Sequence, residues 1–307
     1  MSKTTVVFHS ADMDGIFCSE IARKFLPDAK LVGWDFADAP LPIPEGNIYV
    51  LDLPVDRVFG LDFRKVEDRM EIDFERVCWI DHHASSIASH PTEIPGYRID
   101  GVAACRLAWQ WFRATSESPT GGVHPVKWPI PSKDEFVGRT ILEPLAVRLA
   151  GEYDIWDKRD ERADIFQFGL QSRELHESDW RVLLAVTGGA SRLAKKLCDD
   201  GKILQTYQQR NDKSAMGRSF VVEWEGLKFL ALTTARCNSL TFASKDVPET
   251  GHDALMGFYF NGKTWTVSLY HAKHRTDIDL SQIAVKHGGG GHRGACGFVV
   301  TKLPFIP

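Results

Sequence analysis

Three short apolar runs in this chain each lead directly into residues of the types that bind metal ions. They are Thr4–Phe8 before His9, Asp12 and Asp14, then Ile48–Leu51 before Asp52, and Val77–Ile80 before Asp81, His82 and His83. Short runs of β-branched and aromatic residues bounded by polar ones are typical of buried strands. Parallel strands of an open α/β sheet bring their carboxyl ends to one crevice, where such sheets bind ligands. The pattern therefore predicts one site that combines four aspartates and three histidines.

The composition is that of a globular protein and disfavours several classes of partner. Hydrophobic residues make up 43% of the chain and charged residues 25%. No apolar run approaches the roughly 18 residues of a membrane span. The formal net charge of −4 argues against binding of long nucleic acids, which basic proteins favour. No signal peptide fits before the first strand, and the six cysteines form no CxxC pair, so we expect a cytoplasmic protein with reduced thiols.

The order of strand-like and helix-like segments predicts an α/β protein with two domains. The two kinds of segment alternate in the first 180 residues, which is the signature of a parallel, doubly wound sheet. A basic helical stretch follows, and then mostly strands, two of them joined by the hairpin signal Asn261-Gly262. We expect an N-terminal parallel-sheet domain at 1–190, a helical connector at 191–216, and a smaller mixed-sheet domain at 217–307. The active site would lie between the two domains.

The residues at the strand ends, together with Asp154, offer carboxylate and imidazole donors without a thiolate. Such a set suits hard or borderline divalent ions, of which Mn²⁺ fits best and Mg²⁺, Fe²⁺ and Zn²⁺ are alternatives. Two ions roughly 3.5–4 Å apart need a carboxylate between them, and Asp52, alone at its strand end, is the candidate bridge. Each residue taken singly could be a helix cap or a satisfied core residue. The three strand ends taken together favour a metal site.

A second feature is the run of four glycines at 288–291, which His287 precedes and His292 and Arg293 follow. Consecutive glycines let backbone N–H groups form a concave anion site, and the neighbouring side chains add donors. A plain flexible loop is the alternative. Four other histidines show no partner spacing and are expected at the surface: His90, His124, His176 and His252.

These motifs resemble those of the DHH phosphoesterase family, in the right order and over almost the whole chain. Asp81-His82-His83 resembles the triplet that names the family, and His9-x-x-Asp12-x-Asp14-Gly15 resembles its first motif. Asp52 and Asp154 match the second and fourth motifs, and Gly289-Gly290-Gly291-His292 resembles the signature of the accompanying DHHA1 domain. Gly15 and the Gly-Glu-Tyr-Asp-x-Trp segment at 151–156 resemble the branch that hydrolyses short oligoribonucleotides, the nano-RNases.

The resemblance implies a role for each of these residues. His9, Asp12 and Asp52 would bind one metal ion, and Asp14, Asp52, His82 and Asp154 would bind the second. Asp81 would orient a histidine and His83 would reach the substrate phosphate, so that Asp81, His83 and Asp52 form the catalytic set. The substrate-binding set would comprise His83, Gly289, Gly290, Gly291, His292, Arg293, Asn238 and His271, although His271 stands where relatives commonly have serine.

The sequence as a whole predicts a hydrolase. We expect a two-metal phosphodiesterase that releases nucleoside monophosphates from short oligonucleotides or linear dinucleotides. Neither a membrane nor a long duplex nucleic acid is expected as a partner, and a homodimer is compatible with the sequence. Three alternatives remain: a phosphohydrolase of a cyclic nucleotide, nucleoside bisphosphate or polyphosphate, a long-polymer exonuclease, and a catalytically inactive DHH scaffold. The intact set of six ligand-type residues argues against the last.

Overall fold

The computed structural model of the protein describes residues 3–116, 130–157, 159–186, 190–234, 237, 241–242 and 251–305. The chain forms two compact units, Met1–Leu204 and Gln205–Pro307, and their division falls inside helix α10 (Ala190–Met216). This helix covers the stretch expected to connect the domains, and the three-part division of the chain stays a prediction. In the part of the chain that is described, no helix is both long and apolar enough to cross a bilayer.

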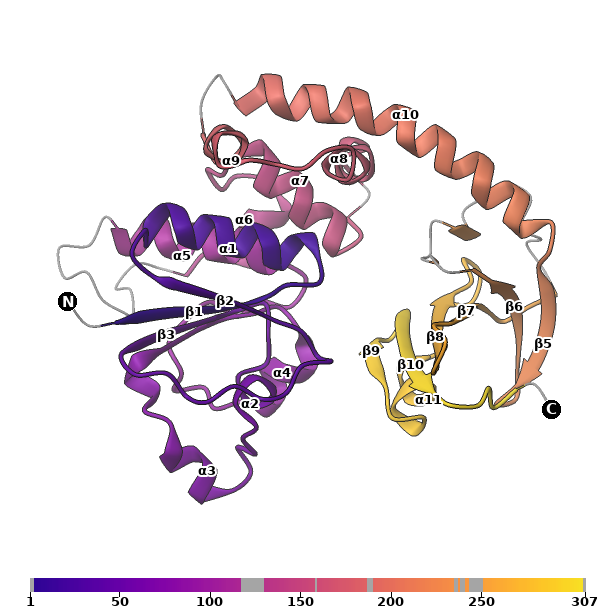
Figure 1. Cartoon of the computed structure of the whole chain (residues 1–307), viewed down its shortest axis with the longest axis horizontal. Helices are drawn as coiled ribbons and strands as arrows, with labels where there is room; N and C mark the ends of the chain where they lie inside the picture. The colour runs from indigo at the N-terminus through magenta and orange to yellow at the C-terminus, as the bar shows by residue number, and fades with distance from the viewer. Residues whose placement is uncertain are drawn as a thin grey trace. The chain divides into compact units, whose positions relative to one another are not determined.

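The first unit is built on a sheet of four parallel strands (Figure 1). The strands are β1 (Thr4–His9), β2 (Lys30–Trp34), β3 (Asn47–Leu51) and β4 (Val77–Ile80), in the order β2-β1-β3-β4. Phe8 of β1 is level with Gly33 of β2 and Leu51 of β3, and Leu51 is level with Ile80 of β4. The strands therefore end close together at one edge of the sheet, as the parallel arrangement predicted from the sequence requires.

Helices cover both faces of this sheet (Figure 1). Helices α1 (Met13–Phe25) and α5 (Ala104–Ser116) share a core with Val6, and α2 (Val55–Phe59) shares another with Val7. Successive residues of a strand point to opposite faces, so one short strand contributes to both cores. The other helical segments of this unit are α3 (Val66–Glu71), η1 (Phe74–Arg76), α4 (Ala84–Ser89), α6 (Lys133–Val137), α7 (Leu145–Asp154), α8 (Arg162–Leu170) and α9 (Glu177–Leu183). The doubly wound α/β architecture predicted from the sequence is confirmed.

The second unit contains a six-stranded mixed sheet. Its strands are β5 (Phe220–Trp224), β6 (Leu227–Thr233), β7 (Ala254–Phe260), β8 (Trp265–His271), β9 (Gly290–His292) and β10 (Ala295–Val300), in the order β5-β6-β7-β8-β10-β9. Strands β6 and β7 are parallel and the other neighbours antiparallel. The predicted Asn261-Gly262 turn joins β7 to β8, with Gly262 at φ 97°. Helix α11 (Ser281–Lys286) buries Ala284 in the core of this sheet.

Candidate metal centre

The predicted metal ligands of the first unit gather at the carboxyl end of its parallel sheet. His9 is the last residue of β1, Asp52 follows β3, and Asp81 to His83 follow β4, which are three adjacent strands. Asp12 and Asp14 lie at the start of α1, and Asp154 is the last residue of α7. The site thus arises because short buried strands end where the chain becomes polar.

Asp52 lies at the middle of this cluster in an unusual backbone conformation. Its φ is 61°, a left-handed value that few residues other than glycine adopt, and its N–H donates to the carbonyl of Ile80 over 2.9 Å. The residue is 1% exposed. Its Oδ2 lies 3.5 Å from His9 Nδ1 and its Oδ1 lies 3.4 Å from His82 Nε2. The two carboxylate oxygens therefore face histidines from two different strand ends.

His9, Asp12 and Asp52 form one group of potential ligands, whose donor atoms all lie within 4.8 Å of one another. His9 Nδ1 is 2.9 Å from Asp12 Oδ2, while Asp12 Oδ1 caps α1 by accepting from the N–H of Gly15 over 3.0 Å. A Cβ at Gly15 would lie only 2.0 Å from the carbonyl oxygen of His9. The glycine of the first motif is therefore required by the close approach of helix α1 to the end of β1.

Asp14, His82 and Asp154 form a second group within the same distance. His82 Nε2 lies 3.4 Å from Asp154 Oδ2 and 3.8 Å from Asp14 Oδ2. The carboxylate of Asp14 is buried and accepts from the backbone N–H groups of Ala104 and Cys105, each over 2.8 Å. These amides begin α5, where the helix dipole favours a negative charge.

The buried Asp81 fixes His83. Its Oδ1 lies 2.7 Å from His83 Nδ1 and also accepts from the backbone N–H groups of His82 and His83. His83 Nδ1 is 3.9 Å from Asp52 Oδ1, and a third group of potential ligands joins Asp52, His82 and His83. The histidine that Asp81 orients is thus His83, and this ring lies within reach of the metal site.

The carboxylates change the proton affinity of both buried histidines. Burial lowers the pKa of His9, but hydrogen bonds and attraction from Asp12 and Asp52 outweigh it and raise the pKa to about 11. Burial likewise opposes the positive form of His82, whereas Asp52, Asp14 and a further carboxylate raise its pKa to about 10. The site therefore stabilises positive charge strongly, which is the electrostatic condition for binding cations.

The carboxylates themselves separate into two kinds. Burial and the negative charge of Asp52 raise the pKa of Asp14 to about 7, and burial with the charge of Asp14 raises that of Asp154 well above its usual value. Burial also disfavours ionised Asp52, but hydrogen bonds from His82 and His9 outweigh this and lower its pKa to about 2. The central carboxylate is thus held in the ionised form that binds cations.

The donor set fits divalent metal ions. All six predicted ligands belong to the groups described above, and the donors are carboxylate oxygens and imidazole nitrogens, which suit Mn²⁺, Mg²⁺, Fe²⁺ or Zn²⁺. Among the described residues, Asp81 Oδ2 has no hydrogen-bond partner, and His9 Nδ1 and Asp52 Oδ1 have charged neighbours but no hydrogen bond of regular geometry. Buried polar atoms are ordinarily satisfied, so these atoms indicate an absent partner such as an ion or water. The assignment of individual ligands to individual ions stays a prediction.

The predicted substrate-binding residues other than His83 belong to the second unit. Gly290 to His292 form β9, an exposed strand that pairs with β10, so the expected glycine-rich loop is in part a strand. Glycine has a low intrinsic preference for strands, and β10 supplies the pairing that overrides it. The side chain of Arg293 donates to the carbonyl of Asp277, and His271 Nε2 lies 2.6 Å from the carbonyl oxygen of Ile278. Asn238 lies outside the described residues.

Two corrections concern polar residues whose surroundings the sequence did not reveal. His90 and His252 are buried, contrary to the expectation that they lie at the surface, and His90 stacks on Trp79 with ring centroids 4.4 Å apart. His176 is exposed and His124 lies outside the described residues. Asp35, which the sequence analysis did not single out, lies 3.6 Å from His9 Nε2. Its position directly after β2 is the signal that could have identified it.

Comparison with known proteins bears on the fold. No family model matches the sequence, and no curated protein sequence matches it significantly. Solved structures do match: exonuclease RecJ bound to manganese aligns at 13% identity and a TM-score of 0.50, over 97% of this chain and 86% of RecJ. The DHH domain of a protein described as a member of a ribosomal-protein family aligns at 13% identity and a TM-score of 0.50, over 97% of this chain and 82% of its own.

A pGpG-specific phosphodiesterase, PggH from Vibrio cholerae, aligns at 14% identity with a TM-score of 0.47, over 97% of this chain and 93% of its own. The two structures at a TM-score of 0.50 match nearly the whole chain, so the likeness extends over both units. Together with the motifs at the sheet edge, they confirm the resemblance first seen in the sequence at the level of the fold. The chain has the fold of the DHH-domain proteins.

Proposed function

We propose that this protein is a metal-dependent phosphodiesterase that hydrolyses short oligonucleotides or linear dinucleotides to nucleoside monophosphates. The observation that carries the proposal is the position of Asp52, whose two oxygens face two groups of potential ligands. A carboxylate placed in this way suits a pair of divalent ions, of which we propose Mn²⁺. Such ions would activate a water nucleophile and neutralise charge on the phosphate.

The protein's own residues have distinct tasks in this proposal. Asp81 holds the Nδ1 side of His83, so His83 would contact the phosphate through Nε2. Asp14 is fixed by the start of α5 and Asp12 by the start of α1, which places both carboxylates before any ion binds. Donors fixed in advance in this way cost little reorganisation when an ion binds.

Short substrates fit the charge of the protein better than long ones. The net charge of −4 gives a long polyanion no general attraction, so affinity must come from local contacts with one end of a short chain. The glycine-rich segment of the second unit, Gly289–Arg293, is the proposed contact for a phosphate or terminal nucleotide. Its residues Gly290–His292 form an exposed strand at the edge of the second sheet, and the outward-facing backbone groups of an edge strand are available to a ligand.

A ladder of 5′-labelled RNAs of two to 24 nucleotides, incubated with Mn²⁺, tests this proposal. We expect dinucleotides to tetranucleotides to be hydrolysed far faster than the 24-mer, with nucleoside monophosphates as products. Parallel assays with pApA, 3′,5′-cyclic AMP and tripolyphosphate separate the alternative phosphohydrolase activities. Equal turnover along the ladder would indicate a processive exonuclease instead, and no hydrolysis of any of these compounds would indicate an inactive scaffold.

A further inference from the structure

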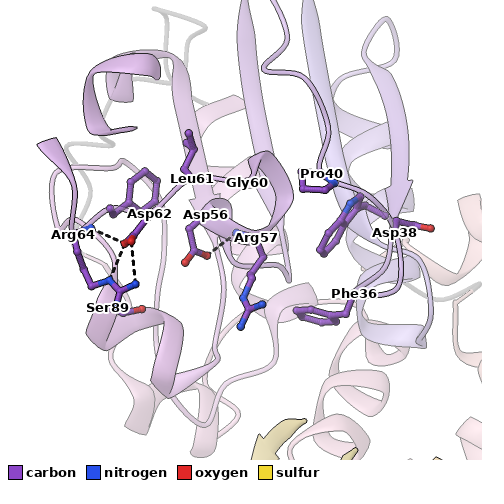
Figure 2. A pocket seen from close by; sticks show the side chains of 12 residues that line it. Phe36, Asp38, Pro40, Asp56, Arg57, Gly60, Leu61, Asp62, Arg64 and Ser89 are labelled. Carbon is purple, nitrogen blue, oxygen red and sulfur yellow. Dashed lines mark hydrogen bonds and ion pairs between the residues drawn. The ribbon is translucent and has the colours of Figure 1, made fainter. Parts of the chain in front are cut away.

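The first unit contains a pocket of about 570 Å³ (Figure 2). It is lined by residues that follow β2, by α2, and by the stretch that leads towards α3. Its volume falls within the roughly 300–1,000 Å³ of small-molecule sites. The pocket adjoins the metal centre through Phe36, which lines the pocket and whose ring packs against that of His9.

Phe36 is an exposed aromatic ring that the fold holds in place. The residue is 54% exposed, yet its ring makes edge-to-face contacts with the rings of His9 and Trp34, both at 5.6 Å between centroids. The backbone around it is also fixed, since the N–H of Asp35 donates to Asp38 Oδ2 and the N–H of Phe36 donates to Asp35 Oδ1. An exposed ring fixed in this way offers a ready surface for stacking a planar group.

The charges of the pocket leave one cation without a fixed partner. Asp62 is bound by Arg64 through contacts of 2.8 and 2.9 Å. Asp56 Oδ1 lies 3.1 Å from His90 Nε2, so this carboxylate gives the buried histidine a polar partner. By contrast, the guanidinium of Arg57 makes no hydrogen bond or ion pair with any described residue. Figure 2 shows Phe36 and Arg57 at the same rim of the pocket.

We infer that this pocket binds a nucleobase of the substrate, whose phosphodiester is held at the metal centre. The inference rests on the proposed function and adds a binding site on the first unit to the one proposed on the second. A nucleobase matches the pocket because it is planar enough to stack on Phe36 and presents acceptors to Arg57. The pocket sets the three carboxylates of Asp38, Asp56 and Asp62 against the two arginines Arg57 and Arg64, so its charge gives a phosphate no advantage over the uncharged base.

Binding of 5′-AMP and of ribose 5-phosphate to the Mn²⁺-loaded protein, measured by calorimetry, isolates the contribution of the base. Both ligands carry the same phosphate and sugar, so the difference in their affinities reports the contacts of adenine alone. The wild type should bind 5′-AMP about tenfold more tightly than ribose 5-phosphate, a factor within the range that aromatic stacking provides. Phe36→Ala should remove most of this difference, while Phe36→Tyr should retain it.

Arg57→Gln should reduce the same difference, whereas Lys65→Gln should leave it unchanged. Lys65 is an exposed cation eight residues further along the chain that does not line the pocket, so it controls for loss of charge alone. Thermal unfolding and Mn²⁺ content should match the wild type in all variants, because Phe36 and Arg57 are exposed and neither is a proposed ligand.

The outcomes for the pocket and for the proposed function are separate. If the wild type shows no preference for 5′-AMP, or if the preference survives in Phe36→Ala, the pocket does not bind the base, whether or not oligonucleotides are cleaved. If the preference depends on Phe36 and Arg57 but no oligonucleotide is hydrolysed, the base site stands and the proposed phosphodiesterase activity fails.

Discussion

At the scale of a single residue, the structure places two requirements on Asp52, one on its side chain and one on its backbone. Its carboxylate must stay ionised while it is buried among other carboxylates, and its backbone must adopt a left-handed conformation. The histidines on either side satisfy the first requirement, because their hydrogen bonds lower the pKa of Asp52 to about 2. The parallel sheet satisfies the second by fixing the N–H of Asp52 to the carbonyl of Ile80.

Replacing Asp52 by Asn should remove most of the activity and lower the metal content. Asparagine keeps the shape but loses the charge that would balance two ions, so the loss should exceed the roughly 10–100-fold effect of residues one step removed from a metal. Hydrolysis of a dinucleotide and elemental analysis of the purified protein measure the two effects. Asp28→Asn makes the same chemical change at an exposed position and should behave as wild type. A variant that keeps two ions and full activity would exclude Asp52 as the bridge.

Metal affinity should rise with pH. The pKa values of His9 and His82 are raised to about 11 and about 10, so both rings hold a proton at neutral pH in the absence of metal. Metal binding must displace these protons, and the apparent affinity should increase by up to about tenfold per pH unit for each proton displaced. Titration with Mn²⁺ between pH 6 and pH 8, in buffers of different ionisation enthalpy, measures affinity and proton release together. Constant affinity over this range without proton release would contradict the charge distribution described for the site.

At the scale of an element, the junction between β1 and α1 determines how His9 and Asp12 meet. Gly15→Ala would place a Cβ 2.0 Å from the His9 carbonyl oxygen and 2.7 Å from the His9 Cβ. The helix start must then shift, so we expect a loss of about 1–3 kcal/mol in stability, as for other overpacked sites, together with weaker Mn²⁺ binding. Gly217→Ala, whose Cβ would meet its nearest neighbour at an ordinary 3.4 Å, is the matched control. Calorimetric unfolding and Mn²⁺ titration measure both properties in the two variants. Equal stability and equal Mn²⁺ affinity in Gly15→Ala and Gly217→Ala would contradict this expectation.

The strands of the first unit could be predicted because local pattern and final environment agree. Val6 and Val7 in β1 and Val50 in β3 are buried within two apolar runs, and the polar residues that follow each run mark the end of the strand. Strand β9 could not be predicted, because Gly290 and Gly291 become a strand only through pairing with β10. The burial of His90 could not be predicted for a similar reason, because it depends on contacts with Trp79 and Asp56, which are distant in sequence. The pocket beside Phe36 depends on three separate segments and left no signal in the sequence.

At the scale of the whole molecule, the proposed reaction divides between two units. All of the described potential ligand groups lie in the first unit, and Gly289–Arg293 lies in the second. His292→Ala should therefore leave the Mn²⁺ content unchanged. For a dinucleotide it should lower kcat and raise KM, because the substrate is held less well in position. Hydrolysis of bis-p-nitrophenyl phosphate, which has no distant nucleotide to hold, should change much less.

Lys263→Ala, at an exposed position in the turn between β7 and β8, is the control for the second unit and should match the wild type on both substrates. An equal loss of activity on both substrates in His292→Ala would place this residue in the chemical step. If the KM for the dinucleotide is unchanged, the glycine-rich segment does not bind the substrate.

The backbone of Asp52 also bears on how this site could arise and be lost. A left-handed residue favours glycine, so Asp52→Gly would relieve local strain of the order of 1 kcal/mol that the aspartate imposes. The backbone conformation and the proposed metal ions thus prefer different residues at this one position. Without selection for metal binding, drift should carry position 52 towards glycine or asparagine. Where the proposed metal ligands are kept, position 52 should stay aspartate against the preference of the backbone.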